Sequence, residues 1–158
     1  MFRIGIGHDT HRIGPGGPLR LGGIDIPWDR GLIGHSDADA LLHAITDAIL
    51  GAAALGDIGE LFPDTAAENK NRDSADMLAR AYGQVVMAGW RIVNLDCIVF
   101  AQKPKLSEWK PALCASIARI LGISAEQVGV KAKTGEGVDA VGREEALQTQ
   151  CVVLLEKG

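Results

Sequence analysis

The sequence predicts an α+β fold in which helices cover one face of a mixed β-sheet. Segments rich in strand-forming residues alternate along the chain with apolar or amphipathic segments of helix length, and no internal repeat is present. A length of 158 residues fits one domain with one core, so residues 1–158 are expected to fold as a unit.

The N-terminal half is expected to begin with a strand over residues 2–7 and a hairpin over 18–27 around Gly22-Gly23. Ser36 resembles a helix N-cap, and the Ala/Leu/Ile-rich helix after it is expected to run to about Leu55. The remaining elements are a polar loop over 60–72, helices over 73–88 and 107–121, and strands over 91–101, 128–133 and 149–156. A ferredoxin-like topology is the arrangement we expect from this order.

Composition and charge limit the kind of partner. The net charge is −4 and no basic stripe is present, which argues against nucleic acid and leaves room for a small phosphate ligand. The longest apolar run is too short for a membrane span, and no leader segment is visible, so a cytoplasmic protein is expected. Cys97, Cys114 and Cys151 lie in apolar segments and suit reduced core thiols.

A candidate metal site combines the first strand with the first long helix. Asp9 and His11 are two residues apart in an extended segment, so their side chains share a face, while His8 points to the other face. The helix is apolar almost all round except for a stripe of Ser36, Asp39, His43 and Asp47. Two histidines and one carboxylate leave a coordination position open, as in catalytic zinc sites. Spacing alone also permits a turn aspartate and two histidines without a metal.

Several polar loops could bind phosphate or a nucleotide, although each also fits an ordinary loop. They are His35-Ser36 before the first long helix, Gly56-Asp57-Ile58-Gly59, Phe62-Pro63-Asp64-Thr65, the segment 101–106 with its two lysines, and the cluster Lys131, Lys133, Thr134 and Glu136. Arg143 and Glu145 could form no more than a surface ion pair.

Long motifs in these same segments resemble one enzyme family. The segments GIGHDTH (5–11), HSDADALLHAITDAILGAAALGDIG (35–59) and FPDT (62–65) look like the signature of the 2-C-methyl-D-erythritol 2,4-cyclodiphosphate synthases. AQKPKL, VKAKTGE and GREE continue the resemblance in the expected order, so it covers essentially the whole chain. It implies a ferredoxin-like fold and a homotrimer whose sheets surround a central axis, with active sites between subunits.

The resemblance also implies roles for particular residues. Zinc is expected on Asp9, His11 and His43, Mg²⁺ or Mn²⁺ on Glu136, and catalytic roles for His35 and Thr134. Substrate contacts are implied for Asp9, His11, His35, Ser36, Asp57, Ile58, Gly59, Phe62, Pro63, Asp64, Thr65 and Ala66, and on the nucleotide side for Ala101, Gln102, Lys103, Pro104, Lys105, Leu106, Lys133, Thr134, Gly135, Glu136, Ala140 and Arg143.

The implied reaction closes a cyclic diphosphate. The 2-phosphate of 4-diphosphocytidyl-2-C-methyl-D-erythritol 2-phosphate attacks the β-phosphorus of its own diphosphate, and CMP leaves, in the non-mevalonate pathway to isoprenoids. A phosphate monoester is mostly ionised at neutral pH, so the nucleophile needs positioning and charge neutralisation rather than a general base. Asp47 is expected to orient a ligand or cap the pocket without binding metal.

The chain departs from the family pattern at three positions. Lys133 and Gly135 stand where the family often has threonines, and Ala140 replaces a frequent phenylalanine of an apolar cavity on the axis. Arg143 and Glu145, which match the charged ring at that cavity, are present. Binding of an isoprenoid diphosphate in the cavity is therefore left open.

Two other classes fit parts of the pattern. Non-haem iron oxygenases also use two histidines and a carboxylate, and they would contain iron and consume O₂ without releasing CMP. A non-catalytic trimeric sensor of a nucleotide diphosphate would need a metal site closed to water.

Overall fold

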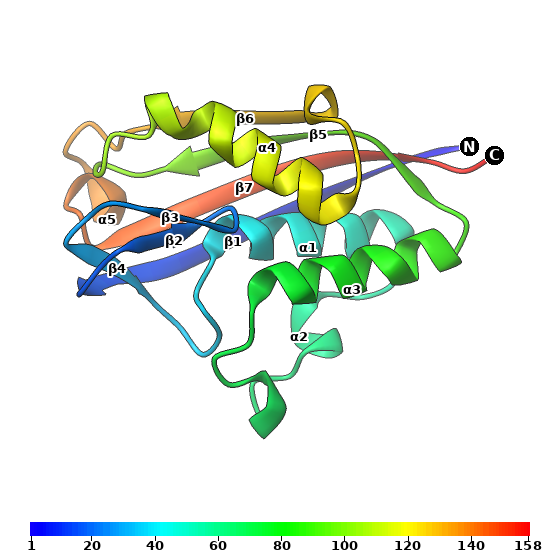
Figure 1. Cartoon of the computed structure of the whole chain (residues 1–158), viewed down its shortest axis with the longest axis horizontal. Helices are drawn as coiled ribbons and strands as arrows, with labels where there is room; N and C mark the ends of the chain where they lie inside the picture. The colour runs from blue at the N-terminus through cyan, green and yellow to red at the C-terminus, as the bar shows by residue number, and fades with distance from the viewer.

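One mixed sheet of five strands forms the centre of the protein. The computed structural model describes all residues 1–158, and its sheet has the strand order β4-β1-β7-β5-β6 (Figure 1). β5 and β6 are parallel and every other neighbouring pair in the sheet is antiparallel. The strands are β1 (Phe2–Pro15), β4 (Arg30–Ile33), β5 (Arg91–Phe100), β6 (Val128–Lys133) and β7 (Ala146–Glu156), and a separate hairpin pairs β2 (Leu19–Leu21) with β3 (Ile24–Ile26).

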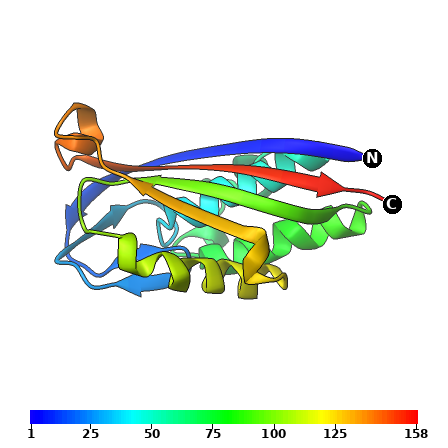
Figure 2. The same ribbon diagram turned by 90° about the horizontal axis from the view of Figure 1, so that it is seen from above.

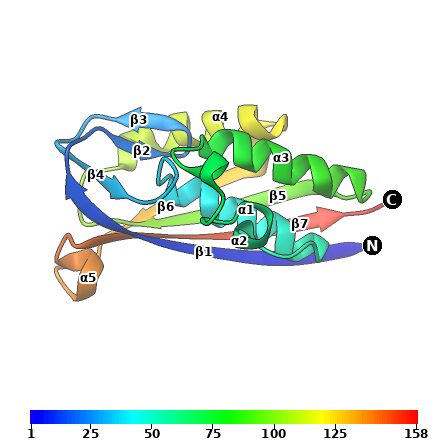
Figure 3. The same cartoon turned by 90° about the horizontal axis from the view of Figure 1, so that it is seen from below.

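The three long helices lie on one face of this sheet (Figures 2 and 3). They are α1 (Ala40–Ala53), α3 (Ser74–Met87) and α4 (Lys110–Leu121). Short turns complete the chain: α2 (Ile58–Leu61), α5 (Asp139–Gly142) and the 3₁₀ turns η1 (Ala67–Asn69), η2 (Ser107–Trp109) and η3 (Ala125–Gln127). No helix is long and apolar enough to cross a bilayer.

α1 is buried on nearly all sides because it packs against both β1 and β7 and against α3. Its leucines and isoleucines, such as Leu41, Ile45 and Ile49, are completely buried and form the centre of the hydrophobic core. The few polar side chains of this helix therefore need partners inside the protein. His43 and Asp47 find such partners in Asp9 and in the backbone N–H of Ile58, at the site described below.

β1 contacts α1 through a face that contains no apolar side chain in its first half. Gly5 and Gly7 alternate with Ile4 and Ile6, and the isoleucines point to the opposite, open face. A Cβ atom at Gly7 would lie 1.8 Å from the carbonyl oxygen of Ala44, and one at Gly5 would lie 2.1 Å from that of Ala48. The backbone of α1 can approach β1 this closely only because both positions are glycine.

The α+β class, the mixed sheet and the one-sided helix layer agree with the sequence prediction, but the connectivity departs from the ferredoxin-like order. A ferredoxin-like chain runs strand, helix, two strands, helix, strand. Here α4 follows β5 directly, and β6 and β7 are the last two strands. α4 serves as the crossover that lets β6 pair in parallel with β5, which a short hairpin loop could not do.

Most element positions were predicted closely, and the differences lie at ends and short pieces. α3, β5, α4 and β6 lie within a few residues of their predicted spans, and Gly122 ends α4 in the left-handed conformation. β1 extends eight residues beyond the predicted 2–7, and β7 begins three residues before 149. β4 was missed, and the loop predicted over 60–72 contains part of α2 and all of η1.

Candidate functional site

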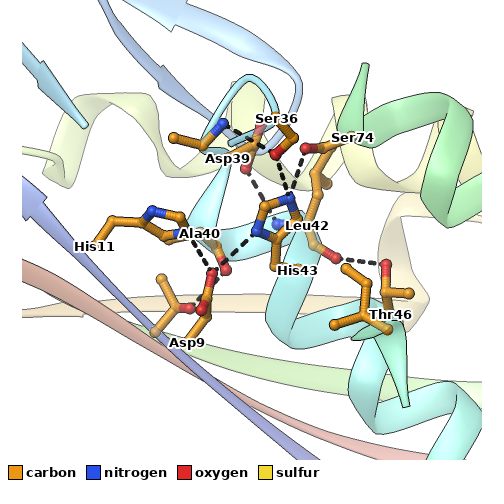
Figure 4. A network of polar contacts seen from close by, with 12 residues as sticks. Asp9, His11, Ser36, Asp39, Ala40, Leu42, His43, Thr46 and Ser74 are labelled. Carbon is orange, nitrogen blue, oxygen red and sulfur yellow. Dashed lines mark hydrogen bonds and ion pairs between the residues drawn. The ribbon is translucent and has the colours of Figure 1, made fainter. Parts of the chain in front are cut away.

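Three potential metal ligands converge between β1 and α1. Asp9 and His11 lie on the helix-facing side of β1, and His43 lies in the first turn of α1 (Figure 4). Their ligand atoms all lie within 4.8 Å of one another. His8 is exposed on the other side of the strand, as the alternation predicted.

The spacing of these atoms suits a tetrahedral ion. Oδ2 of Asp9 lies 2.8 Å from Nε2 of His11 and 3.1 Å from Nδ1 of His43. Neighbouring ligands of a tetrahedral zinc with bonds of 2.0–2.1 Å lie about 3.3 Å apart. Two imidazoles and one carboxylate are typical zinc ligands, and other transition metals also accept them. The donor set therefore fits a metal ion without fixing which one.

Hydrogen bonding and charge prepare this site for a cation. Nδ1 of His11 lies 2.8 Å from the carbonyl oxygen of Ile33, which can only accept, so Nδ1 carries a proton and Nε2 is the nitrogen that faces Asp9 and is available to a metal ion in the neutral ring. Burial raises the pKa of Asp9, but when the rings of His11 and His43 are in their charged form, their hydrogen bonds and positive charge outweigh burial and hold the pKa at about 2. Burial lowers the pKa of His11, but its hydrogen bond and attraction to Asp9 raise it overall. Both shifts show that positive charge beside Asp9 is stabilised.

Asp39, not Ser36, caps α1. The Asp39 carboxylate is completely buried, accepts a hydrogen bond from the Leu42 N–H, and also accepts the N–H groups of Gly22 and Gly23. Burial raises the pKa of Asp39 more than these three hydrogen bonds lower it, so the pKa is raised overall. The predicted N-cap was wrong because the chain bends at residues 35–37 and the helix begins only at Ala40. Oγ of Ser36 lies instead 3.1 Å from Nε2 of His43, and the helix-dipole argument does not apply to His35-Ser36.

A pocket of about 210 Å³ opens around the triad. It brings together the predicted residues from β1 and α1 with part of the predicted loop, and it adds two residues that the sequence did not single out, Asn69 and Met77. Its lining consists of Asp9, His11, His35, Ser36, His43, Ile58, Gly59, Phe62, Asp64, Asn69 and Met77. Asp57, Pro63, Thr65 and Ala66 are not among them. The Asp57 carboxylate caps α2 by accepting the Glu60 N–H at 2.9 Å.

Internal contacts hold the loop on this side of the pocket. Asn69 donates from Nδ2 to the Pro63 carbonyl at 2.8 Å, and Arg72 donates from Nη1 to Oδ1 of Asn69 at 2.9 Å. The Arg72 guanidinium also lies over the Phe62 ring, 4.7 Å from its centre. Asp47 fixes the start of α2 because its carboxylate accepts the Ile58 N–H at 2.7 Å. It contacts the pocket wall and is not part of the metal-ligand group.

A second pocket of about 400 Å³ lies between β5, β6 and the start of α4. It contains most of the predicted nucleotide segment and adds Ser107, Lys110 and Ala132. Its lining consists of Ala101, Gln102, Pro104, Lys105, Leu106, Ser107, Lys110, Ala132, Lys133 and Thr134. The two pockets share no residue.

The other predicted residues of this half lie near the second pocket or apart from it. Oε1 of Gln102 accepts the N–H groups of Gly135 and Gly137 at 3.2 and 3.4 Å, which ties the two loops together. Lys103 points away and pairs with Glu144 at 3.5 Å. Four further predicted residues do not line it, Gly135 among them. Glu136 is exposed with a positive φ of 50°, Ala140 lies in α5, and Arg143 forms an exposed ion pair with Glu145 at 2.9 Å.

The sequence is similar to that of known proteins over nearly its whole length. Residues 2–156 match the YgbB family. The chain belongs to the YgbB family. The 2-C-methyl-D-erythritol 2,4-cyclodiphosphate synthase of Rhodopirellula baltica is 55% identical over 156 residues, covering 99% of this chain and 94% of that protein. The protein of the same name from Chromobacterium violaceum is 58% identical over 155 residues, 98% of each chain.

Solved structures of YgbB-like proteins have the same fold. A 2C-methyl-D-erythritol-2,4-cyclodiphosphate synthase with CDP bound superposes with a TM-score of 0.90 at 39% identity, over 98% of this chain and all of the other. The bifunctional IspDF from Campylobacter jejuni gives a TM-score of 0.96 at 42% identity. This chain is covered completely in that match but spans only 43% of the bifunctional protein.

Proposed function

We propose that this chain converts 4-diphosphocytidyl-2-C-methyl-D-erythritol 2-phosphate to 2-C-methyl-D-erythritol 2,4-cyclodiphosphate with release of CMP, a step of the non-mevalonate route to isoprenoid precursors. The observation that carries the proposal is the identity of 55% and 58% to proteins named for this product over nearly the whole chain. Residues 1–158 would act as one catalytic domain in the cytoplasm.

The reaction exchanges one phosphorus–oxygen bond for another. An oxygen of the 2-phosphate forms a bond to the β-phosphorus, and the bond from that phosphorus to the oxygen it shares with the α-phosphorus breaks. CMP leaves with that oxygen, and no water is consumed. The attacking phosphate is already mostly ionised at neutral pH, so the protein needs to align it and to offset its charge.

The triad pocket supplies residues suited to that task. Asp9, His11 and His43 would hold Zn²⁺, which, when bound, neutralises charge on the phosphate oxygens. Outside this pocket, in the loop after β6, Glu136 would hold Mg²⁺ or Mn²⁺ against the same substrate. His35 and Ser36 line the triad pocket and can donate hydrogen bonds to a phosphate oxygen. The Phe62 to Ala66 loop would close over the sugar part of the substrate. Burial of the reacting groups in this pocket would limit the access of water.

The lining of the second pocket supports its assignment as the site for the cytidine diphosphate part of the substrate. Its lining includes Lys105, Lys110 and Lys133, whose ammonium groups can neutralise the negative charge of phosphate groups. Backbone groups of residues 101–106 can form hydrogen bonds with a base. Thr134 adds a hydroxyl for the transferred phosphoryl group. The solved synthase with CDP bound supports a cytidyl ligand here.

The two half-sites would come together in a homotrimer. A pocket of about 210 Å³ is smaller than the 300–1,000 Å³ of ordinary small-molecule sites, and the two pockets share no residue. The open face of the sheet exposes Phe2, Ile4 and Ile6 by 64%, 74% and 68%, an apolar surface suited to burial between subunits. In a cyclic trimer the contacts are heterologous, so the triad of one subunit can face the nucleotide pocket of its neighbour.

Phosphorus NMR tests the proposed reaction directly. The purified chain, incubated with the diphosphocytidyl substrate, zinc and Mg²⁺, is expected to give the resonances of a cyclic diphosphate and of CMP in equal amounts. Iron in the purified protein, with O₂ uptake and no CMP, would instead support an oxygenase. Binding of CDP without any turnover would support a sensor.

Mixed trimers test the shared site. His11→Ala inactivates the triad half and a Lys105→Ala/Thr134→Ala variant inactivates the other half, so each trimer alone should be inactive. After refolding equal amounts together, random mixing should restore about one quarter of the sites, because each half has a one-half chance of being intact. Mixed trimers verified by mass spectrometry that release no CMP would contradict the shared arrangement.

A further inference from the structure

On the side of its ring away from Asp9, His43 is linked through a hydroxyl group to a second carboxylate. Nε2 of His43 lies 2.7 Å from the hydroxyl of Ser74, the first residue of α3, which is completely buried. That hydroxyl donates a hydrogen bond to Oδ1 of Asp37. The three side chains therefore form a continuous row from His43 to Asp37, and Figure 4 shows the serine end of this row beside the His43 ring.

The carboxylate of Asp37 fixes the direction of these hydrogen bonds. It also accepts the N–H of Ser74 at 3.1 Å and the N–H of Asp39 at 3.2 Å, so all its contacts with neighbouring groups are with donors. Ser74 has one hydroxyl proton, and it goes to Asp37. The Ser74 oxygen can then only accept from Nε2 of His43, which must carry the ring proton.

A proton on Nε2 leaves the lone pair of a neutral ring on Nδ1, the atom that lies 3.1 Å from Asp9. Without this row, Asp9 would itself favour a proton on Nδ1, since a carboxylate is a strong acceptor. The hydroxyl of Ser36 also lies 3.1 Å from Nε2, but it has no contact with Asp37 and can serve as donor or acceptor. Ser74 is therefore the group that imposes a direction.

We propose that Ser74 and Asp37 are positioning residues that hold His43 as the Nε2–H tautomer, so that its Nδ1 is presented to a metal ion beside Asp9. The inference rests on the proposed metal site. His11 has the opposite arrangement, with the proton on Nδ1 donated to Ile33. The two histidines thus present different nitrogens to one point, each set by a separate partner.

The same row also anchors the chain that leads to the pocket loop. The Asn71 N–H donates to the His35 carbonyl at 2.9 Å, and the Asp37 N–H donates to the Arg72 carbonyl at 3.2 Å. Together with the Ser74–Asp37 bonds, these contacts join the segment 35–39 to the segment 71–74. Ser74 and Asp37 therefore orient His43 from a part of the chain that is itself held in place.

The tautomer can be read in the wild-type chain. After removal of metal by a chelator, long-range ¹H–¹⁵N correlation of labelled histidine is recorded at about pH 8.5, two units above the ordinary histidine pKa of about 6.5. His43 is expected to show its proton on Nε2, with the assignment made by the loss of its signals in His43→Ala. A major Nδ1–H form in wild type would overturn the proposal.

Zinc affinity provides the second test. Ser74→Ala is expected to shift His43 toward Nδ1–H and to weaken zinc binding by roughly 10- to 100-fold in chelator competition, the range for loss of an outer partner of a metal ligand. Ser74→Thr keeps the hydroxyl and should restore affinity, and Ser36→Ala should weaken binding less than Ser74→Ala. A folded Ser74→Ala chain with wild-type zinc affinity and a wild-type His43 tautomer would contradict the positioning role of Ser74 and leave the metal site standing. Zinc retained by His43→Ala would instead contradict the metal site.

Discussion

The triad pocket and the nucleotide pocket differ in how their side chains are held. In the triad pocket the ligands stand on a long strand and a buried helix, and both histidine rings have a hydrogen-bond partner on the side away from Asp9. In the nucleotide pocket, Lys105, Lys133 and Thr134 are exposed, and the fixed contacts are mainly backbone groups gathered by Gln102. One half is held rigidly before a ligand arrives, and the other is built from loops.

How firmly a side chain is held determines how large an effect its substitution should have. A side chain held by several partners has little freedom to adapt, so its loss should remove a function outright. An exposed lysine or glutamate can be partly replaced by its neighbours or by water, so its loss should change affinity by a moderate factor. The two halves should therefore respond to equally small changes with effects of very different size.

The largest effect is expected for His43→Ala. Removal of one of three ligands should weaken zinc binding by more than about 100-fold, beyond the effect of losing an outer partner, and should abolish CMP release. Metal analysis after dialysis and a CMP assay measure the two effects. His8→Ala, on the other face of β1, is the matched control and should keep its zinc. Full zinc occupancy with normal turnover in His43→Ala would refute the triad.

A moderate effect is expected for Glu136→Gln. The variant should keep its zinc, and the Mg²⁺ concentration for half-maximal rate should rise on the order of 10-fold, because one charged oxygen ligand is lost. Glu126→Gln, an exposed change in η3, is the control and should leave the Mg²⁺ dependence unchanged. If Glu136→Gln has an unchanged rate and metal requirement, the second cation lies elsewhere.

The smallest effect is expected for Asp47→Asn, because the amide keeps an oxygen that can accept the Ile58 N–H. Burial and repulsion from Asp57 and Asp9 outweigh that hydrogen bond and raise the pKa of Asp47. Ionised Asp47 is thus less favourable in the fold than in the unfolded chain, so its contribution to stability falls as pH rises from 3.8 through the raised value. At neutral pH the variant should melt at the same temperature or slightly above wild type, with its zinc retained. Loss of zinc would mean that Asp47 is a ligand.

The elements and ligands that follow simple periodicity could be predicted from sequence. The two-residue spacing of Asp9 and His11 and the polar stripe of α1 led to the observed triad, because both reflect local geometry. The length of β1 could not be read in the same way. From residue 5 to residue 11 its helix-facing side consists of Gly5, Gly7, Asp9 and His11, while the apolar side chains of Ile4 and Ile6 face outward, so the usual alternation of a half-buried strand is reversed there.

Residues whose roles depend on tertiary contacts could not be predicted from the sequence. The sequence places Asp37 inside the helix expected after Ser36, and no local pattern marks Ser74. Their roles arise because the segments 35–39 and 71–74 meet in the fold, and no local pattern records that meeting. Asp39 belongs to the polar stripe predicted from the sequence, but its partners Gly22 and Gly23 lie 17 and 16 residues earlier, in a hairpin whose contact with Asp39 no periodicity records.

The absence of side chains at Gly5 and Gly7 has a consequence for mutational tolerance. Gly7 lies two residues before Asp9, and the carbonyl that its Cβ would strike belongs to Ala44, the neighbour of His43. Any larger residue would have to push α1 away from β1 and so separate the two groups of ligands. Positions with no chemistry of their own therefore set the span of the metal site. In a comprehensive substitution scan they should be as intolerant as the ligands themselves, whereas the nucleotide loops remain open to change.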